Sequence, residues 1–173
     1  RSYIDYMITD PDNNTIEVSI EGNSFVMQTY PKDPLALKIT DEEGKSVGVK
    51  ETDVSPVYQF DDERFLMCKI QPYSYEGVNY FVLTIDEKDW AFAVTDNGTY
   101  YRNELGKLVS LRKVDASLFK DHLSFGSGRG YIWSRTFPMM KDTALIGYGA
   151  DTYCIHFPHE DYAGKYNAGW GIN

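Results

Sequence analysis

The chain has 173 residues, of which 42% are hydrophobic, so it is long and apolar enough for one packed domain with or without an appendage. Its net charge of −9 makes it a poor binder of polyanions and argues against nucleic acid as a partner. It contains no signal peptide and no run of about 18 apolar residues, and it begins at "RSYIDYMITD" without a Met. We therefore expect a piece of a longer protein, and the lack of membrane spans here does not make that protein soluble.

Residues 15 to about 113 follow the pattern of successive short strands separated by turns. "TIEVSIEG" alternates apolar and polar residues, as a half-buried strand does. Stretches such as "DEEG", "SYEG" and "DNG" place glycine where a hairpin needs a positive φ. About eight strands at this spacing predict an antiparallel β-sandwich or a small barrel, and the pattern does not distinguish the two. The 14 tyrosines suit strands, and they also suit a carbohydrate-binding surface, because a ring stacks on a sugar while its hydroxyl stays wet.

The pattern changes after Val114. "DASLFKDHL" predicts a short helix over 115–123, and "SFGSGRG" predicts a flexible joint. Between about 130 and 145 the apolar residues recur at helical spacing, with Pro138 expected to kink or restart the helix. They form one stripe of Trp133, Phe137, Met140 and Ala144. The sequence thus predicts a mainly β fold, with a β-rich domain over 1–114 and a short C-terminal α-helical segment over 115–173.

Arg129 stands between two glycines, where this second helix is predicted to begin. A cation in the first turn is disfavoured by the partial positive charge at the helix N-terminus, so Arg129 is unexpected at this position. If Ser127 caps the helix, the guanidinium and free backbone N–H groups converge on one spot, which suits a phosphate or diphosphate. The alternative is a solvent-exposed loop arginine. Trp133 lies one turn further on the same face, whereas Arg135 does not, and the simpler interpretation of Arg135 is a surface ion pair with an acid such as Asp142.

Two histidines, His156 and His159, lie close together in "HFPH", but Pro158 separates them and they do not form a helical pair. With Asp151 and Asp161 nearby they suggest a metal site, yet no third strong ligand has a suitable spacing, so no metal is predicted. One histidine acting as a general base is a better catalytic hypothesis, and a plain surface histidine is the ordinary alternative.

Other motifs with known chemistry are absent from the sequence. It has no phosphate-binding Gly-rich loop and no serine nucleophile elbow, so no cofactor is predicted. The acidic groups at 41–43 and 61–63 lie in turns and are best explained as solvated. Cys68 and Cys154 have apolar neighbours and no metal-binding spacing, which leaves buried thiols or one disulfide, and we favour free thiols.

Residues 126–167, "GSGRGYIWSRTFPMMKDTALIGYGADTYCIHFPHEDYAGKYN", resemble a stretch of the bacterial O-antigen ligase/polymerase family of membrane proteins. That stretch has a small-residue–Gly–Arg start, a Trp, an apolar helix, a Gly-rich turn and an "FPxxDYxGK" pattern. The matching residues are Ser127-Gly128-Arg129, Trp133, the turn 147–153, Phe157-Pro158, Asp161-Tyr162 and Gly164-Lys165. This chain departs from the pattern at Ala150, where Pro is usual, and at His159, where a polar amide is usual.

The resemblance implies an extracytoplasmic loop of a multi-span membrane protein, with residues 1–114 as an insertion. It implies a glycosyltransferase that moves a glycan from an undecaprenyl-diphosphate carrier to an acceptor without metal or nucleotide. The partners would be a lipid-linked oligosaccharide or polysaccharide and, through flanking spans, the membrane. The family's loop arginine, thought to hold the diphosphate, corresponds to Arg129. Candidate catalytic residues are Arg129, His156 and His159, and candidate substrate-binding residues are Arg129, Trp133, Arg135 and Asp151.

Three hypotheses follow, in this order. The first is the glycosyltransferase domain, which we expect to be inactive once separated from its membrane-bound carrier. The second is a glycan-binding β module without catalysis, which would show a row of exposed aromatic rings on one sheet face. The third is a soluble hydrolase that uses Asp151 with His156 or His159, which requires these side chains to meet in one pocket.

Overall fold

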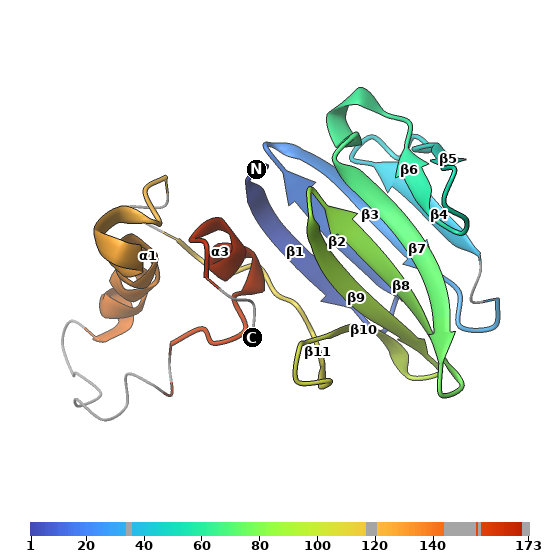
Figure 1. Ribbon diagram of the computed structural model, residues 1–173. Coiled ribbons are helices and arrows are strands. Elements are labelled where there is room, and N and C mark those ends of the chain that lie inside the picture. The colour runs from blue at the N-terminus through green and yellow to red at the C-terminus, as the bar shows by residue number, and fades with distance from the viewer. Residues whose placement is uncertain (34–35, 117–120, 144–154, 156, 171–173) are drawn as a thin grey trace. The chain divides into compact units, whose positions relative to one another are not determined.

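The computed structural model describes residues 1–33, 36–116, 121–143, 155 and 157–170, drawn in colour in Figure 1. The chain divides into two compact units, the first over Arg1–Leu111 and the second over Arg112–Ile172. The division falls close to Val114, where the sequence pattern changes.

The first unit is built from two antiparallel sheets, which confirms the mainly β prediction. The smaller sheet contains β1 (Ile4–Asp10), β2 (Thr15–Ile20), β3 (Asn23–Thr29) and β4 (Leu37–Asp41). The larger sheet contains β5 (Val49–Glu51), β6 (Tyr58–Phe60), β7 (Cys68–Tyr75), β8 (Val78–Ile85), β9 (Lys88–Thr95), β10 (Gly98–Arg102) and β11 (Leu108–Val109). A short 3-10 helix, η1 (Glu63–Phe65), precedes β7.

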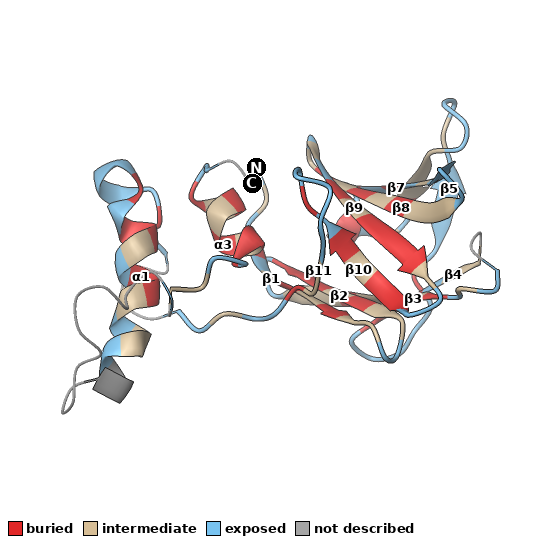
Figure 2. Cartoon of the chain, turned by 90° about the horizontal axis from the view of Figure 1, so that it is seen from below, coloured by how far each residue is buried: buried red, intermediate tan, exposed pale blue. Residues whose placement is uncertain are grey.

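Every strand of each sheet pairs with its neighbour in the sequence, so both sheets are simple meanders. This follows from the short hairpin turns that the sequence marks with glycine, since such turns connect only adjacent antiparallel strands. Buried and half-buried residues alternate along strands such as β1 and β3, and the turns between strands are largely exposed (Figure 2). The apolar residues that recur with a period of two in the sequence therefore form the buried face of these strands.

The chain also joins the two sheets at both sides. On one side, Val47 donates its N–H to Ile39 of β4, and two residues later Val49 pairs with Phe60 of β6. On the other side, the residues after β11 reach β1, where Leu111 N–H donates to the Thr9 hydroxyl at 2.8 Å. The unit has two facing sheets, as in a β-sandwich, and the sheets are linked at both sides, as in a small barrel. The strand pattern in the sequence is therefore consistent with either fold.

The core lies between the sheets and is rich in aromatic rings. The Phe25 ring on β3 lies 5.0 Å from that of Phe60 and 4.9 Å from that of Phe65, and all three side chains are fully buried. The buried hydroxyls of Thr29 and Thr99 form a hydrogen bond of 2.6 Å across the two sheets. Burial of three such rings supplies much of the stabilisation that fixes the sheets face to face.

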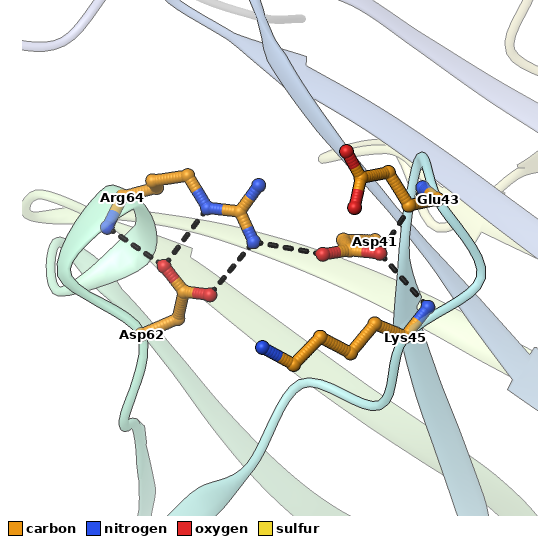
Figure 3. A network of polar contacts seen from close by, with 5 residues as sticks. All are labelled: Asp41, Glu43, Lys45, Asp62 and Arg64. Carbon is orange, nitrogen blue, oxygen red and sulfur yellow. Dashed lines mark hydrogen bonds and ion pairs between the residues drawn. The ribbon is translucent and has the colours of Figure 1, made fainter.

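The two acidic turns at 41–43 and 61–63 meet at one arginine (Figure 3). The Arg64 guanidinium donates to Asp41 at 2.9 Å and to both carboxylate oxygens of Asp62 at 2.8 and 3.0 Å. Asp41 also accepts the backbone N–H groups of Glu43 and Lys45, and it is buried. The expectation of solvated turns is thus wrong for Asp41, because the arginine that neutralises it comes from another turn.

The second unit contains α1 (Phe125–Thr143) and α3 (Tyr162–Asn167). Helix α1 confirms the C-terminal helical segment and continues through Pro138 without non-helical backbone angles at that residue. The stripe residues Trp133, Phe137 and Met140 are 40%, 37% and 53% exposed. Ala144 of the stripe lies outside the described residues, and so do residues 117–120 of the helix predicted over 115–123.

Candidate functional site

Helix α1 opens with an unusual turn. Gly126, Ser127 and Gly128 all have left-handed backbone angles, with φ of 62°, 59° and 90°. Glycine adopts this conformation without steric cost, whereas Ser127 between the two glycines adopts it at a cost because it has a Cβ. An N-cap residue has an extended backbone, so Ser127 is not the cap of this helix, contrary to the argument from sequence. The right-handed helix begins at Arg129.

The glycines around Arg129 are explained by close packing. A Cβ on Gly128 would overlap the Trp170 indole, and a Cβ on Gly130 would overlap the carbonyl oxygen of His122. Both glycines are buried, while Arg129 between them is exposed. The local sequence thus fixes the backbone on either side of the arginine and presents the arginine itself to solvent.

The start of the helix offers fewer free donors than the sequence suggested. The Tyr131 N–H donates to the Leu123 carbonyl at 2.9 Å, and the Gly128 N–H donates to the Ser124 carbonyl at 3.3 Å. These carbonyl oxygens occupy donors that a bound phosphate would otherwise use. Recognition of an anion here would rest chiefly on the Arg129 guanidinium.

Arg135 forms a buried ion pair with Asp161, at 2.5 Å between Nε and Oδ2. Their side chains are only 7% and 5% exposed. The same guanidinium lies 5.3 Å from the centre of the Tyr131 ring and donates to the Ser134 hydroxyl. Arg135 is therefore not the surface arginine that the sequence suggested, and its charge is compensated within the protein rather than offered to a substrate.

Asp161 explains the "DYAGK" stretch in physical terms. Its second carboxylate oxygen caps α3 by accepting the Gly164 N–H at 2.9 Å. A Cβ on Gly164 would overlap both Asp161 and Arg135, so only glycine leaves room for the ion pair. Lys165 donates to the His159 carbonyl at 2.7 Å and lies over the Tyr162 ring, and burial lowers the pKa of its ammonium group. Asp161, Tyr162, Gly164 and Lys165 thus each take part in the packing of this stretch.

The start of helix α1 and the residues around α3 pack together through aromatic rings. The Tyr131 ring lies 5.0 Å from that of Trp170 and 6.1 Å from that of Phe157. Tyr131 is fully buried with Leu123 in a small apolar cluster. The structure thus brings residues 128–135 of the helix start together with residues 157–170 near the C-terminus.

The remaining candidates are only partly described. His159 is exposed and lines a surface hollow of about 330 Å³ together with Arg112 and Glu160. Trp133 is exposed on α1, and its ring lies 6.5 Å from that of Phe125. His156 and Asp151 lie outside the described residues, so their pairing in a hydrolase site stays a prediction.

The first unit contains a separate cavity of about 490 Å³, lined mainly by apolar residues of β4 to β8 that include Ile39, Ile70 and Phe81. Cys68 is a free, buried thiol, and burial raises its pKa to about 12, which keeps it protonated and unreactive. Cys154 lies outside the described residues. Within the described ranges, no group of three or more His, Cys, Asp and Glu side chains could hold a metal ion.

The sequence argument named Asp161 only near a possible metal site and in the family pattern, and it did not single out Tyr131 or Trp170, although the three residues hold this site together. The only local signal was an aspartate three residues before a glycine at the start of a short helix, the spacing of an N-cap. None of the helices in the described part of the chain is both long and apolar enough to span a membrane. Comparisons with protein-family models, with curated proteins and with solved structures find no match to this chain.

Proposed function

We propose that this chain is the extracytoplasmic part of a membrane glycosyltransferase of the O-antigen ligase/polymerase type. The enzyme would transfer a glycan from an undecaprenyl-diphosphate carrier to an acceptor. One observation carries the proposal. The separated stretches that bear the resemblance, around Arg129 and around Asp161, pack against each other in the second unit through the ion pair between Arg135 and Asp161.

Within this proposal Arg129 contacts the diphosphate. It is exposed, and the tight packing of Gly128 and Gly130 limits the motion of its backbone. A guanidinium binds two phosphate oxygens through parallel N–H donors and keeps its charge at any physiological pH. Arg135 is a positioning residue, because it acts by holding the helix to residues 161–164.

The acceptor would be activated by a general base. His159 is the described candidate, since it lines the surface hollow next to Glu160 and Arg112. A neutral imidazole nitrogen can take a proton from a sugar hydroxyl. His156 remains a second candidate for this role, and Trp133 and Asp151 remain candidates for binding the glycan.

The test is glycan transfer by the full-length parent protein in membranes. We expect Arg129→Ala to lower transfer roughly 10- to 100-fold, the range for losing a charge-assisted hydrogen bond in the transition state. Arg129→Lys should restore little of it, because an ammonium group lacks the planar fork. The matched control is Lys107→Ala, which removes an exposed cation from the β10–β11 turn. Full activity of both Arg129 variants at normal membrane levels would refute the proposal.

A further inference from the structure

The outward face of the larger sheet carries an ordered row of tyrosines. In the strand register Tyr73 of β7 pairs with Tyr80 of β8, Tyr80 pairs with Ala93 of β9, and Ala93 pairs with Tyr100 of β10. Their sequence neighbours Phe81 and Tyr101 are buried in the core. Because successive side chains of a strand point to opposite faces, Tyr73, Tyr80 and Tyr100 all point outward. These three residues are called the tyrosine row below.

The rings of this row are arranged rather than scattered. Tyr73 and Tyr80 are stacked, with ring centres 4.9 Å apart and planes 11° apart. Ala93 is fully buried although it lies on the outward face, because its neighbours on both sides are tyrosines. Tyr73 is 36% exposed, and Tyr80 and Tyr100 are half-buried. The row therefore crosses four adjacent strands, with one face of the Tyr73 ring and one face of the Tyr80 ring turned toward each other.

Hydrogen-bonding groups lie directly beside the row. Arg102 is exposed, and its guanidinium lies 6.0 Å from the centre of the Tyr80 ring. Gln71 lies two residues before Tyr73 on the same face of β7 and is exposed. Burial raises the pKa of Tyr73, so its hydroxyl stays protonated at neutral pH and can both donate and accept. The aromatic rings and these hydrogen-bonding side chains therefore lie on the same face of strands β7 to β10.

We propose that the tyrosine row, with Arg102 and Gln71 beside it, binds an uncharged glycan chain. The apolar faces of pyranose rings would stack on Tyr100 and on the face of Tyr73 turned away from Tyr80, and sugar hydroxyls would bond to Arg102, Gln71 and the Tyr73 phenol group. The chemistry of the surface selects this partner. A purely apolar partner would leave the guanidinium and amide without hydrogen bonds, and a polyanionic one would be repelled by the net charge of −9. The inference rests on the first unit and is independent of the role proposed for Arg129.

The experiment is a calorimetric titration of the chain 1–173 with a panel of hexasaccharides. Cellohexaose, chitohexaose and mannohexaose are the uncharged probes, and hexagalacturonate is the charged one. We expect saturable binding of at least one uncharged probe. Tyr73→Ala and Tyr100→Ala should each weaken it by about tenfold or more, since each removes one ring on which a sugar would stack. Tyr30→Ala, which removes a tyrosine 40% exposed outside the row, should leave the affinity unchanged.

Three results would overturn the proposal. They are no saturable binding of the uncharged probes at millimolar concentration, binding that the row variants do not weaken, or preferential binding of hexagalacturonate. Sedimentation velocity separates one further alternative, since a dimer that Tyr73→Ala dissociates, without glycan binding, would assign the face to a second copy of the chain. Circular dichroism of each variant ensures that a loss of binding does not come from unfolding. Failure here would leave the transfer experiment with Arg129 unaffected.

Discussion

The two units of this chain are stabilised in different ways. The first unit has two facing sheets and a large aromatic core, in which residues such as Phe25, Phe65 and Trp90 are fully buried. In the described part of the second unit, a small apolar cluster around Tyr131 is joined by a buried ion pair and by glycines without room for a Cβ. A distributed core tolerates the loss of any one contact better than a unit that depends on a few specific ones. The second unit should therefore be the more sensitive of the two to single substitutions.

The largest effect on the first unit is expected from Phe25→Ala. It would empty the space between Phe60 and Phe65, whose rings contact Phe25 at 5.0 and 4.9 Å. Loss of a buried Phe side chain costs about 3–5 kcal/mol, through lost burial and the cavity that remains. Hydrogen exchange resolved along the chain should show faster exchange across residues 1–111 and unchanged exchange in residues 121–143. Slower or unchanged exchange in the strands would mean that this cluster is not the centre of the core.

Arg135→Ala should have a comparable effect confined to the second unit. It leaves the Asp161 carboxylate buried without its partner, which costs about 3–5 kcal/mol. Hydrogen exchange should quicken in α1 and α3 while the β strands stay protected. The matched control is the double variant Arg135→Met with Asp161→Leu, which removes both charges and should recover part of the loss. A double variant that is less stable than Arg135→Ala would show that the cap on α3 matters more than the ion pair.

This contrast also explains what the sequence could and could not predict. The strands follow from alternation within a few residues, as in "TIEVSIEG", and adjacent strands pair because short turns connect them. The ion pair joins residues 26 apart, and nothing near Arg135 marks it as buried. Arg64 was missed for the same reason, since its partner Asp41 lies 23 residues earlier. Local patterns specify elements, whereas the compensation of buried charge depends on which elements meet.

The tyrosine row was partly predictable, unlike the buried ion pairs, which no local pattern indicated. The number of tyrosines suggested a glycan-binding face, and the alternation of strands β7, β8 and β10 put the rings on one side. The alignment of Tyr73, Tyr80 and Tyr100 across three strands required the register, which depends on the exact length of each turn. Tyrosines on the outward face of these strands were therefore predictable, and their alignment was not.

The smallest effect concerns the pH dependence of the first unit. Hydrogen bonds from Arg64 lower the pKa of Asp62 from its ordinary value of 3.8 to about 2, and they also lower that of Asp41. A carboxyl group whose pKa is lower when folded binds protons more tightly when unfolded. Its contribution to stability is complete above about pH 4 and is lost as the pH falls toward about pH 2. Urea unfolding followed by circular dichroism of the β strands should show this loss.

Replacing Arg64 should remove that pH dependence. Arg64→Gln should lower the unfolding midpoint at neutral pH and flatten its decline between about pH 4 and about pH 2, because both carboxylates lose the donor that favours their charged form. Lys50→Gln is the matched control, since it removes an ion pair with Asp61 whose side chains are 73% and 43% exposed. Exposed pairs contribute about 0–1 kcal/mol, so this variant should keep the wild-type decline. An equal decline in wild type and Arg64→Gln would place the acid sensitivity in other carboxylates, and the arginine would then serve only to join the two turns.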